Sequence, residues 1–525
     1  MIVEILKKYI FRNKINLLAC FICGLFLIMN LLTLSDYGVS WDEPVQQEVS
    51  IAAISYIKTG NLDNIVFSDN DLKFYGPFFG ILDHFSAKIA STFFNLNHID
   101  SHHILLVIFS SIGLLVLYFF VKKLFDEKTA IFSLLFIALF PRFIGDSHYN
   151  PKDIPLMIFS VIVLFLLFLV FNKEKGRYAV FAGIFFGLAL SIRVDSLLFL
   201  PIFLISYLAY FIWIKTKFKD IFSFKRISLF GLFFFSSAAT LFLTWPSLWK
   251  NPLLFFYSIS YFLHHGWTGS VLYSGKIYAG NNLPWHYMPV YLLITTPVLT
   301  LLFLSFGLFV SFKKIIHKDI KLFSFILIIL WLFIPLFVQM RSGIVKYDGI
   351  RHFFIAIPAL AILAGLGLNY AMANLRLWFP KSFKLLLALP LLIISIPLYE
   401  IIKAHPYEGY YFNEPLRYLI PRNIEKYFDV EYWGTSYREG LVWLNKNVSE
   451  KTKICVPIAS HLIKEYELWN DLTFNCVGHY DYLMFPSRNS ALLEYTAKET
   501  GSSDDLVFQV RRFDSAILSI YKINN

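Results

Sequence analysis

Two adjacent carboxylates, Asp42 and Glu43, follow the first long apolar segment of the chain and are flanked by Trp41 and Pro44. Charged side chains near a bilayer are costly unless they are paired or functional. Asp42 has the chemistry of a general base, which takes a proton from an attacking hydroxyl group. Glu43 could orient that hydroxyl or tune Asp42, because two neighbouring carboxylates need not both ionise. The doublet is therefore our first candidate for a catalytic centre.

Further ionisable and polar side chains occur in three later turns, each beside the end of an apolar segment. We predict that they share one face of the membrane with the doublet and form a polar pocket. The alternative is a set of solvated loop ends, and Asp195 could simply pair with Arg193. The candidate binding residues from these turns are Asp146, Asn150, Lys152, Asp153, Arg193, Lys346, Tyr347, Arg351 and His352.

The composition requires a lipid environment. Of 525 residues, 57% are hydrophobic and only 16% are charged, against about 25% charged in a soluble domain. Continuous apolar runs of about 20 residues recur, which is the length that crosses a bilayer as a helix. The runs do not alternate, as the strands of a barrel would. The chain is predicted to be a polytopic α-helical membrane protein, and its net charge of +11 reflects basic loops rather than a nucleic-acid partner.

We expect about eleven transmembrane helices, and the charge of the connections orients them. Short connections rich in Lys and Arg alternate with long or sparsely charged ones, and the positive-inside rule makes the basic set cytoplasmic. The N-terminal segment is then cytoplasmic, and the part of the chain after residue 400 is extracytoplasmic. The membrane that the helices are predicted to cross is the cell (inner) membrane. The predicted spans are 15–34, 103–121, 129–145, 154–171, 178–193, 196–214, 227–245, 289–311, 321–340, 353–372 and 383–400.

Two domains follow from this pattern. Residues 1–400 form the transmembrane domain, with outer loops 35–102 and 246–288 above the pocket. Trp285 and His286 in the second loop belong to an interfacial aromatic belt or stack on sugar rings. Residues 401–525 are polar and mixed, and we predict a small extracytoplasmic α/β domain. Cys455 and Cys476 in that domain could pair, since the compartment permits disulfides, or remain buried thiols.

Several kinds of site are absent from the sequence. Gly275-Lys276 lacks the earlier glycine of a phosphate-binding loop, and no histidine pair has the spacing of a helical zinc site. No cofactor is certain, although a divalent metal ion between Asp42 and either Asp146 or Asp153 is possible. An outward-facing site without nucleoside triphosphate needs an activated donor that dissolves in the membrane, and a polyprenyl-phosphate sugar meets that need.

An ordered set of motifs carries a resemblance to a known family. Besides the Asp42-Glu43 pair, the set comprises Tyr75-Gly76-Pro77, Asn150-Pro151-Lys152-Asp153, Pro284-Trp285-His286-Tyr287, Thr295-Thr296-Pro297, Tyr347-Asp348-Gly349-Ile350-Arg351-His352-Phe353, His405-Pro406-Tyr407 and Tyr432-Trp433-Gly434-Thr435-Ser436-Tyr437. Over most of residues 35–445 the chain resembles C-type-fold membrane glycosyltransferases, close to the dolichyl-phosphate-mannose protein mannosyltransferase family (family 39) and its bacterial relatives. The tail lacks the large sugar-binding repeats of the eukaryotic members.

The resemblance implies a C-type glycosyltransferase fold and a hexosyl- or mannosyl-type transferase. Such an enzyme would move a sugar, with inversion, from a polyprenyl phosphate to a hydroxyl of a lipid, glycan or protein acceptor. Asp42 would be the base, and Asp146 or Asp153 would hold the acceptor or the donor sugar. The departing phosphate would be stabilised by charged donors, namely Arg351 and His352 together with Lys346, Lys152 and Arg193.

Two other classes of function remain open. A transporter or flippase of lipid-linked sugars would place ionisable or broken segments near the membrane midplane and show an internal repeat. A non-catalytic membrane scaffold would account for the external domain but not for charged turns gathered at one depth. The sequence favours the transferase.

Overall fold

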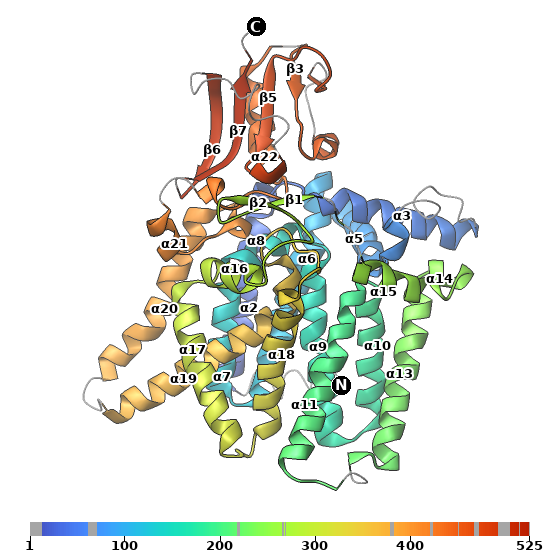
Figure 1. Cartoon of the computed structure of the whole chain (residues 1–525), viewed down its shortest axis with the longest axis vertical. Coiled ribbons are helices and arrows are strands. Elements are labelled where there is room, and N and C mark those ends of the chain that lie inside the picture. The colour runs from blue at the N-terminus through green and yellow to red at the C-terminus, as the bar shows by residue number, and fades with distance from the viewer. Residues whose placement is uncertain are drawn as a thin grey trace.

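The computed structural model describes residues 13–60, 71–217, 221–264, 267, 269–378, 383–420, 424–449, 451–466, 472–491, 505–513 and 515–523. Residues 1–12, whose charges support the predicted cytoplasmic N-terminus, lie outside these ranges. Long helices form the larger part of the molecule, and a small sheet domain sits at one end of them (Figure 1).

Among the described residues, the eleven predicted spans correspond in order to one bent pair, α7 (Glu127–Ala138) with α8 (Pro141–Tyr149), and to ten long helices. They are α2 (Lys14–Leu32), α6 (His98–Leu124), α9 (Asp153–Lys173), α10 (Gly176–Leu190), α11 (Phe199–Trp213), α13 (Phe224–Thr244), α17 (Val298–Ile316), α18 (Leu322–Met340), α19 (Ile357–Trp378) and α20 (Phe383–Ala404). Within the described residues, eight helical segments are long and apolar enough to cross a membrane, or nine when the bent pair α7 and α8 counts as one. The two remaining predicted spans correspond to α10, an apolar helix of 15 residues, and to α20. The chain is a multi-pass membrane protein.

Two predicted spans are not continuous. Segment 129–145 divides into α7 (Glu127–Ala138) and α8 (Pro141–Tyr149), which meet at an angle of 64°. Segment 289–311 divides into α16 (Tyr287–Thr295) and α17, with Pro297 between them. Proline lacks an amide hydrogen and clashes with the preceding turn, so each helix restarts at or after its proline. The short helices α8 and α16 lie at the end of the bundle that carries the charged turns and the sheet domain (Figure 1).

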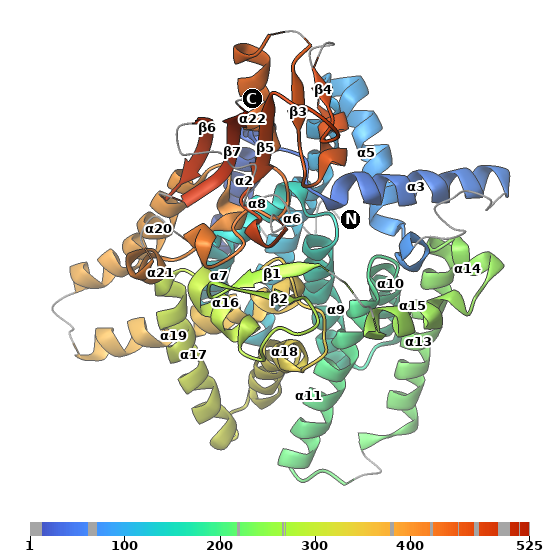
Figure 2. The ribbon, with the colours of Figure 1, turned by 45° about the horizontal axis from the view of Figure 1, so that its top comes forward.

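The predicted outer loops contain short elements that cover this end. The first loop carries α3 (Asp42–Thr59), η2 (Asp71–Phe74) and α5 (Phe78–Phe94). The second carries α14 (Ser247–Lys250), α15 (Leu254–His264) and a hairpin of β1 (Ser270–Tyr273) and β2 (Lys276–Ala279). Figure 2 shows the hairpin of β1 and β2 below the sheet domain, whereas α3, α14 and α15 lie to one side of it.

The tail is a small α/β domain, as expected. Its sheet has the order β4-β3-β5-β7-β6, formed by β3 (Lys453–Cys455), β4 (Thr473–Phe474), β5 (Tyr482–Pro486), β6 (Leu506–Arg512) and β7 (Ser515–Lys522). Helix α22 (Tyr437–Asn447) packs on this sheet through Leu441 and Leu444, which are buried. A disulfide joins Cys455 at the end of β3 to Cys476 just after β4.

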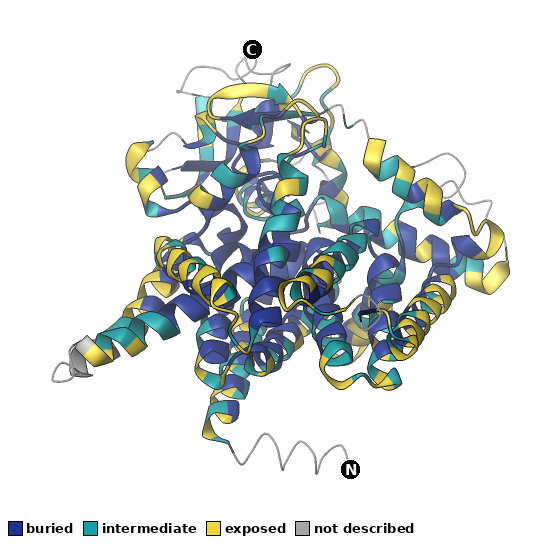
Figure 3. Ribbon diagram, turned by 60° about the horizontal axis from the view of Figure 1, so that its bottom comes forward, coloured by how far each residue is buried: buried dark blue, intermediate teal, exposed yellow. Residues whose placement is uncertain are grey.

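Burial follows the contrast between a packed interior and a lipid-facing exterior. Residues at the centre of the bundle are buried, whereas the outward faces of peripheral helices are exposed (Figure 3). Trp331 is fully buried beside Phe120, while Phe235 on α13 is 76% exposed. Apolar side chains are stable on such a face only if lipid covers it.

Candidate active site

Arg351 lies at the centre of a cluster of buried ion pairs. Its Nη2 is 2.5 Å from Asp42 Oδ2, its Nε is 3.1 Å from Asp153 Oδ2, and its Nη1 is 3.0 Å from Asp348 Oδ2. The side chain of Arg351 is only 5% exposed. The planar guanidinium presents its donors in a fixed fork, so a single Arg can hold three carboxylates. Turns far apart in the sequence therefore meet at one point.

Local helix geometry fixes each partner of Arg351. Asp42 begins α3, and Asp153 begins α9, where the helix dipole favours a negative charge. Asn150 locks the second turn, because its Oδ1 accepts from the Asp153 amide at 2.9 Å and its Nδ2 donates to Asp153 Oδ2 at 3.1 Å. The same Nδ2 donates to Asp146 Oδ1 at 2.7 Å. Asp146 is thus hydrogen-bonded within the turn that carries Asp153.

Two further cations border the cluster. Arg193 is 3.2 Å from Asp153 and 2.6 Å from Asp195. Lys152 Nζ is 3.5 Å from Asp42 Oδ2, longer than an ordinary hydrogen bond, and 4.4 Å from the centre of the Tyr75 ring. The contact of Lys152 with Asp42 is therefore longer than the contact of Arg351 with the same oxygen.

The surrounding charges set the protonation of Asp42. Burial disfavours its charged form, but nearby Lys152 and Arg351 outweigh that effect and hold the pKa of Asp42 below its usual range. Burial also lowers the pKa of Lys152, and Asp42 opposes that shift. Asp42 is thus an ionised carboxylate at neutral pH. The same cations make it a weak base, because they stabilise its charged form.

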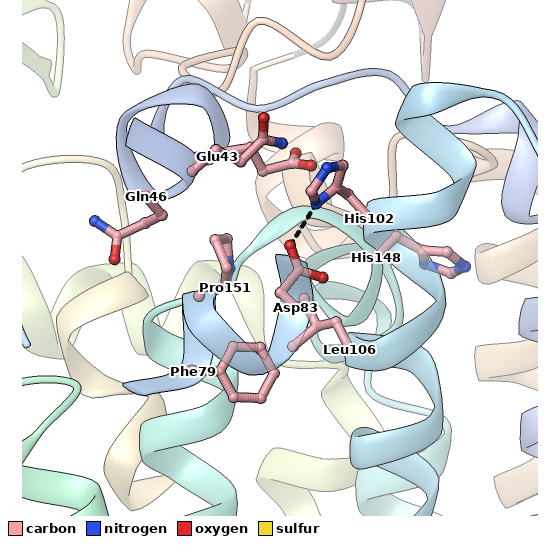
Figure 4. A pocket seen from close by; sticks show the side chains of 10 residues that line it. Glu43, Gln46, Phe79, Asp83, His102, Leu106, His148 and Pro151 are labelled. Atoms are coloured by element: carbon pink, nitrogen blue, oxygen red, sulfur yellow. Dashed lines mark hydrogen bonds and ion pairs between the residues drawn. The ribbon is translucent and has the colours of Figure 1, made fainter. Parts of the chain in front are cut away.

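Glu43 points away from Asp42, so the two adjacent carboxylates contact different groups. One Glu43 oxygen accepts from the Ser40 amide at 2.7 Å, and the other lies 3.0 Å from His103 Nε2. Figure 4 shows Glu43 at a small cavity of about 20 Å³, near Asp83 and His102. We predicted that Glu43 orients an acceptor or tunes Asp42, and that role stays a prediction. In the structure Glu43 contacts the backbone of the turn that carries Asp42 and the side chain of His103.

Three other predicted residues lie apart from the cluster. Lys346 Nζ donates to the Arg341 carbonyl at 2.9 Å, and His286 Nδ1 lies 2.7 Å from the Tyr273 hydroxyl. Trp285 is 61% exposed. Residue type and loop position alone suggested these three, and neither property determines the direction of a side chain.

Tyr347 and His352 border the cluster without an ion pair to it among the described residues. The Tyr347 ring stacks on Trp267 at 4.4 Å and lies 5.5 Å from the Arg351 guanidinium. His352 meets the edge of Tyr347 at 4.8 Å. Both residues can shape the wall beside Arg351.

The tail domain adds residues that the sequence did not single out as site residues. The Trp433 ring lies 4.3 Å from the Arg351 guanidinium, and the Trp41 amide donates to the Trp433 carbonyl at 2.7 Å. Arg488 Nη2 is 3.1 Å from Asp348 Oδ1. Nothing local marks Arg488, because its role depends on how the tail packs.

The carboxylates do not fit the divalent ion that the sequence left possible. The Arg351 guanidinium lies between Asp42 and Asp153, and Asp146 is engaged by Asn150. Among the described residues, no group of three or more His, Cys, Asp or Glu side chains is arranged to hold a metal ion.

Comparisons with known proteins agree with this architecture. Residues 84–240 match the family model of dolichyl-phosphate-mannose-protein mannosyltransferase. ArnT from Cupriavidus metallidurans in the apo state is 11% identical, with a TM-score of 0.53 over 96% of this chain and 97% of that one. The chain has the C-type glycosyltransferase fold. The archaeal oligosaccharyltransferase AglB from Archaeoglobus fulgidus, solved with an inhibitory peptide and a dolichol-phosphate, has this fold too, at 13% identity and a TM-score of 0.52 over 92% of this chain and 70% of that one.

No curated protein sequence matches the chain. The resemblance predicted from the motifs is nevertheless confirmed, because the C-type glycosyltransferase fold extends over nearly the whole chain and the family model covers part of it.

A second ion cluster ties the C-type fold to its tail domain and makes stability depend on pH. His405, just past α20, lies 2.8 Å from Glu408 and 3.0 Å from Asp36. Burial favours the neutral ring, but hydrogen bonds to Glu408 and Asp36 outweigh it and raise the pKa of His405 to about 8. The unfolded value is about 6.5, so this contribution of about 2 kcal/mol is complete below pH 6.5 and disappears as pH rises through 8.

We therefore expect the purified protein to melt at a lower temperature at pH 9 than at pH 6, and His405→Gln to remove most of that difference. Thermal denaturation in detergent measures it. The matched control is His479→Gln, which alters a half-exposed histidine of the same tail domain. An unchanged pH dependence in His405→Gln would contradict the assignment.

Proposed function

We propose that the protein is an inverting glycosyltransferase that moves a sugar from a polyprenyl-phosphate donor to an acceptor hydroxyl at the outer face of the cell membrane. One observation carries the proposal: a single carboxylate oxygen of Asp42 faces both Arg351 and Lys152 at the outer end of the helices. A base and two cations in contact are what the transfer of a sugar from a phosphate requires.

In this reaction the acceptor oxygen attacks the anomeric carbon while the bond from that carbon to the phosphate oxygen breaks. Asp42 takes the hydroxyl proton, a contribution of about 10²–10⁴-fold. The phosphate leaves with the bonding electron pair and is stabilised by Arg351, Lys152 and Arg193. A single displacement reverses the anomeric configuration. The phosphate needs no proton to depart, so a strong general acid is unnecessary.

The ion pairs also suggest how Asp42 becomes a competent base. While Arg351 and Lys152 hold it, its low pKa makes proton transfer to it unfavourable. A donor phosphate competes for the same cations, since charge-assisted bonds to phosphate are strong. As the cations turn toward phosphate, the pKa of Asp42 rises. Donor binding would thus precede and activate attack by the acceptor.

We propose the donor and the acceptor by their chemical class. A polyprenyl chain can dissolve beside the exposed apolar faces of the helices, and hydroxyls of a lipid, glycan or protein can approach from outside. A hexosyl donor, mannosyl among others, suits the resemblance of residues 84–240. The N-terminus would be cytoplasmic and the tail extracytoplasmic.

A transporter of lipid-linked sugars is the second candidate, and the location of the charges argues against it. Such a protein would carry its substrate site near the midplane of the bilayer. Here Asp42, Lys152 and Arg351 all lie at helix ends, beneath the tail domain.

Comparison of cell-envelope glycans and glycolipids by mass spectrometry, with and without the gene for this protein, tests the function. We expect one glycan, glycolipid or glycoprotein to lose the mass of a single sugar, and the Asp42→Asn variant not to restore it. A full restoration by that variant would favour transport or scaffolding.

A further inference from the structure

Arg488 reaches from the tail domain into the ion-pair cluster. It follows β5 and is only 8% exposed. Its Nη2 lies 3.1 Å from Asp348 Oδ1, and its Nη1 donates to the Tyr432 carbonyl at 3.4 Å. The guanidinium also lies 5.2 Å from the centre of the Trp41 ring, next to Asp42 in the chain. Arg488 thus touches both segments that carry the candidate catalytic groups.

Asp348 connects Arg488 to the centre of the site. One oxygen of Asp348 faces Arg488, and the other accepts from Arg351 Nη1 at 3.0 Å. Arg351 in turn contacts Asp42. Four charged groups of alternating sign therefore form a continuous chain from the tail domain to the candidate base.

We propose that Arg488 is a positioning residue through which the tail domain sets the orientation of Arg351, so that the tail is part of the active centre. This inference rests on the proposed function. Arg488 holds Asp348, and Asp348 in turn fixes one N–H donor of Arg351. The remaining donors of the Arg351 guanidinium are then directed toward Asp42 and the incoming phosphate. A displacement of about 1 Å in such a group can cost about 10²-fold in rate.

The pH dependence separates positioning from simple packing. Burial raises the pKa of Asp348, while Arg488 and Arg351 oppose that shift. Without Arg488 the pKa of Asp348 rises further, and a protonated Asp348 no longer holds Arg351 as an ion pair. The acid limb of the rate profile therefore moves to higher pH. The titratable and charged groups that face Asp348 are Arg488, Arg351, Asp42, Tyr287, Tyr347 and Tyr432.

The experiment compares the full-length protein with Arg488→Ala and Arg488→Lys, using Arg511→Ala as a matched control. Arg511 is an exposed arginine of the same domain, on β6. The readouts are the pH profile of sugar transfer and the affinity for undecaprenyl phosphate as a probe of the phosphate site. We expect Arg488→Ala to lower kcat by about 10²-fold and to move the acid limb up by about one pH unit. Arg488→Lys should restore the acid limb, because it restores the charge, but only part of the rate.

A variant that merely loosens the fold would lower the melting temperature and the active fraction, yet leave the acid limb in place. That outcome, or an Arg488→Ala rate within twofold of the parent, would overturn the proposal. If the parent transfers no sugar, the proposed function fails, and undecaprenyl phosphate binding still decides the role of Arg488. We expect about tenfold weaker binding in Arg488→Ala and unchanged binding in Arg511→Ala. Equal binding by all variants, or none by the parent, would exclude positioning of the phosphate site.

Discussion

Asp42→Asn is expected to lower sugar transfer by about 10²–10⁴-fold while the protein still folds. The amide has the shape of the carboxylate and can still accept a hydrogen bond from Arg351, so the cluster keeps most of its geometry. It cannot take the proton of the attacking hydroxyl. The rate of product formation by the purified protein, at saturating donor, measures the effect.

Glu48→Gln is the matched control for this variant. Glu48 lies on the same helix, α3, and its side chain is exposed, so we expect a rate within twofold of the parent. Transfer by Asp42→Asn within tenfold of the parent would show that Asp42 is not the base. An equal melting temperature of both variants would separate a chemical loss from a folding defect.

Arg351→Lys is expected to lower kcat/KM for the donor by at least about 10²-fold, although it keeps the positive charge. Lysine is a point charge and cannot hold Asp42, Asp153 and Asp348 through one planar fork. The unpaired carboxylates also lower stability, since breaking a buried ion pair costs about 3–5 kcal/mol. Activity per folded molecule, with the folded fraction taken from the melting curve, is the relevant measurement.

Arg226→Lys provides the control for that substitution. Arg226 pairs with Glu174 after α9, where the predicted cytoplasmic loops lie. The same chemical change there should leave transfer within twofold of the parent. Comparable losses in both variants would mean that Arg351 contributes general stability rather than a phosphate contact.

The fold class can be predicted from the sequence because a lipid bilayer restricts the length and the hydrophobicity of the helices that cross it. Apolar runs of about 20 residues and basic connections suffice to place a helix such as α9 or α18. The breaks between α7 and α8 and between α16 and α17 were missed, although Pro141 and Pro297 mark them. A hydropathy pattern does not distinguish a continuous span from two short helices.

The sequence predicts the part of the site that depends on the positions of helix ends. Asp42, Asp153 and Arg351 all adjoin apolar segments, so their common depth follows from topology. The direction of a side chain does not follow, which is why Glu43 points to His103 and Lys346 to a carbonyl. The role of Arg488 could not be predicted from the sequence, because only the packing of the tail domain brings this residue to Asp348.

The stereochemistry of transfer tests the central claim most directly. The purified protein would be given an undecaprenyl-phosphate sugar of defined anomeric configuration, with an envelope extract as the source of acceptor, and the linkage in the product would be determined by NMR. The account predicts that every new glycosidic bond has the opposite configuration to the donor. Retention of the donor configuration, which requires a covalent sugar intermediate, would contradict a direct displacement assisted by Asp42.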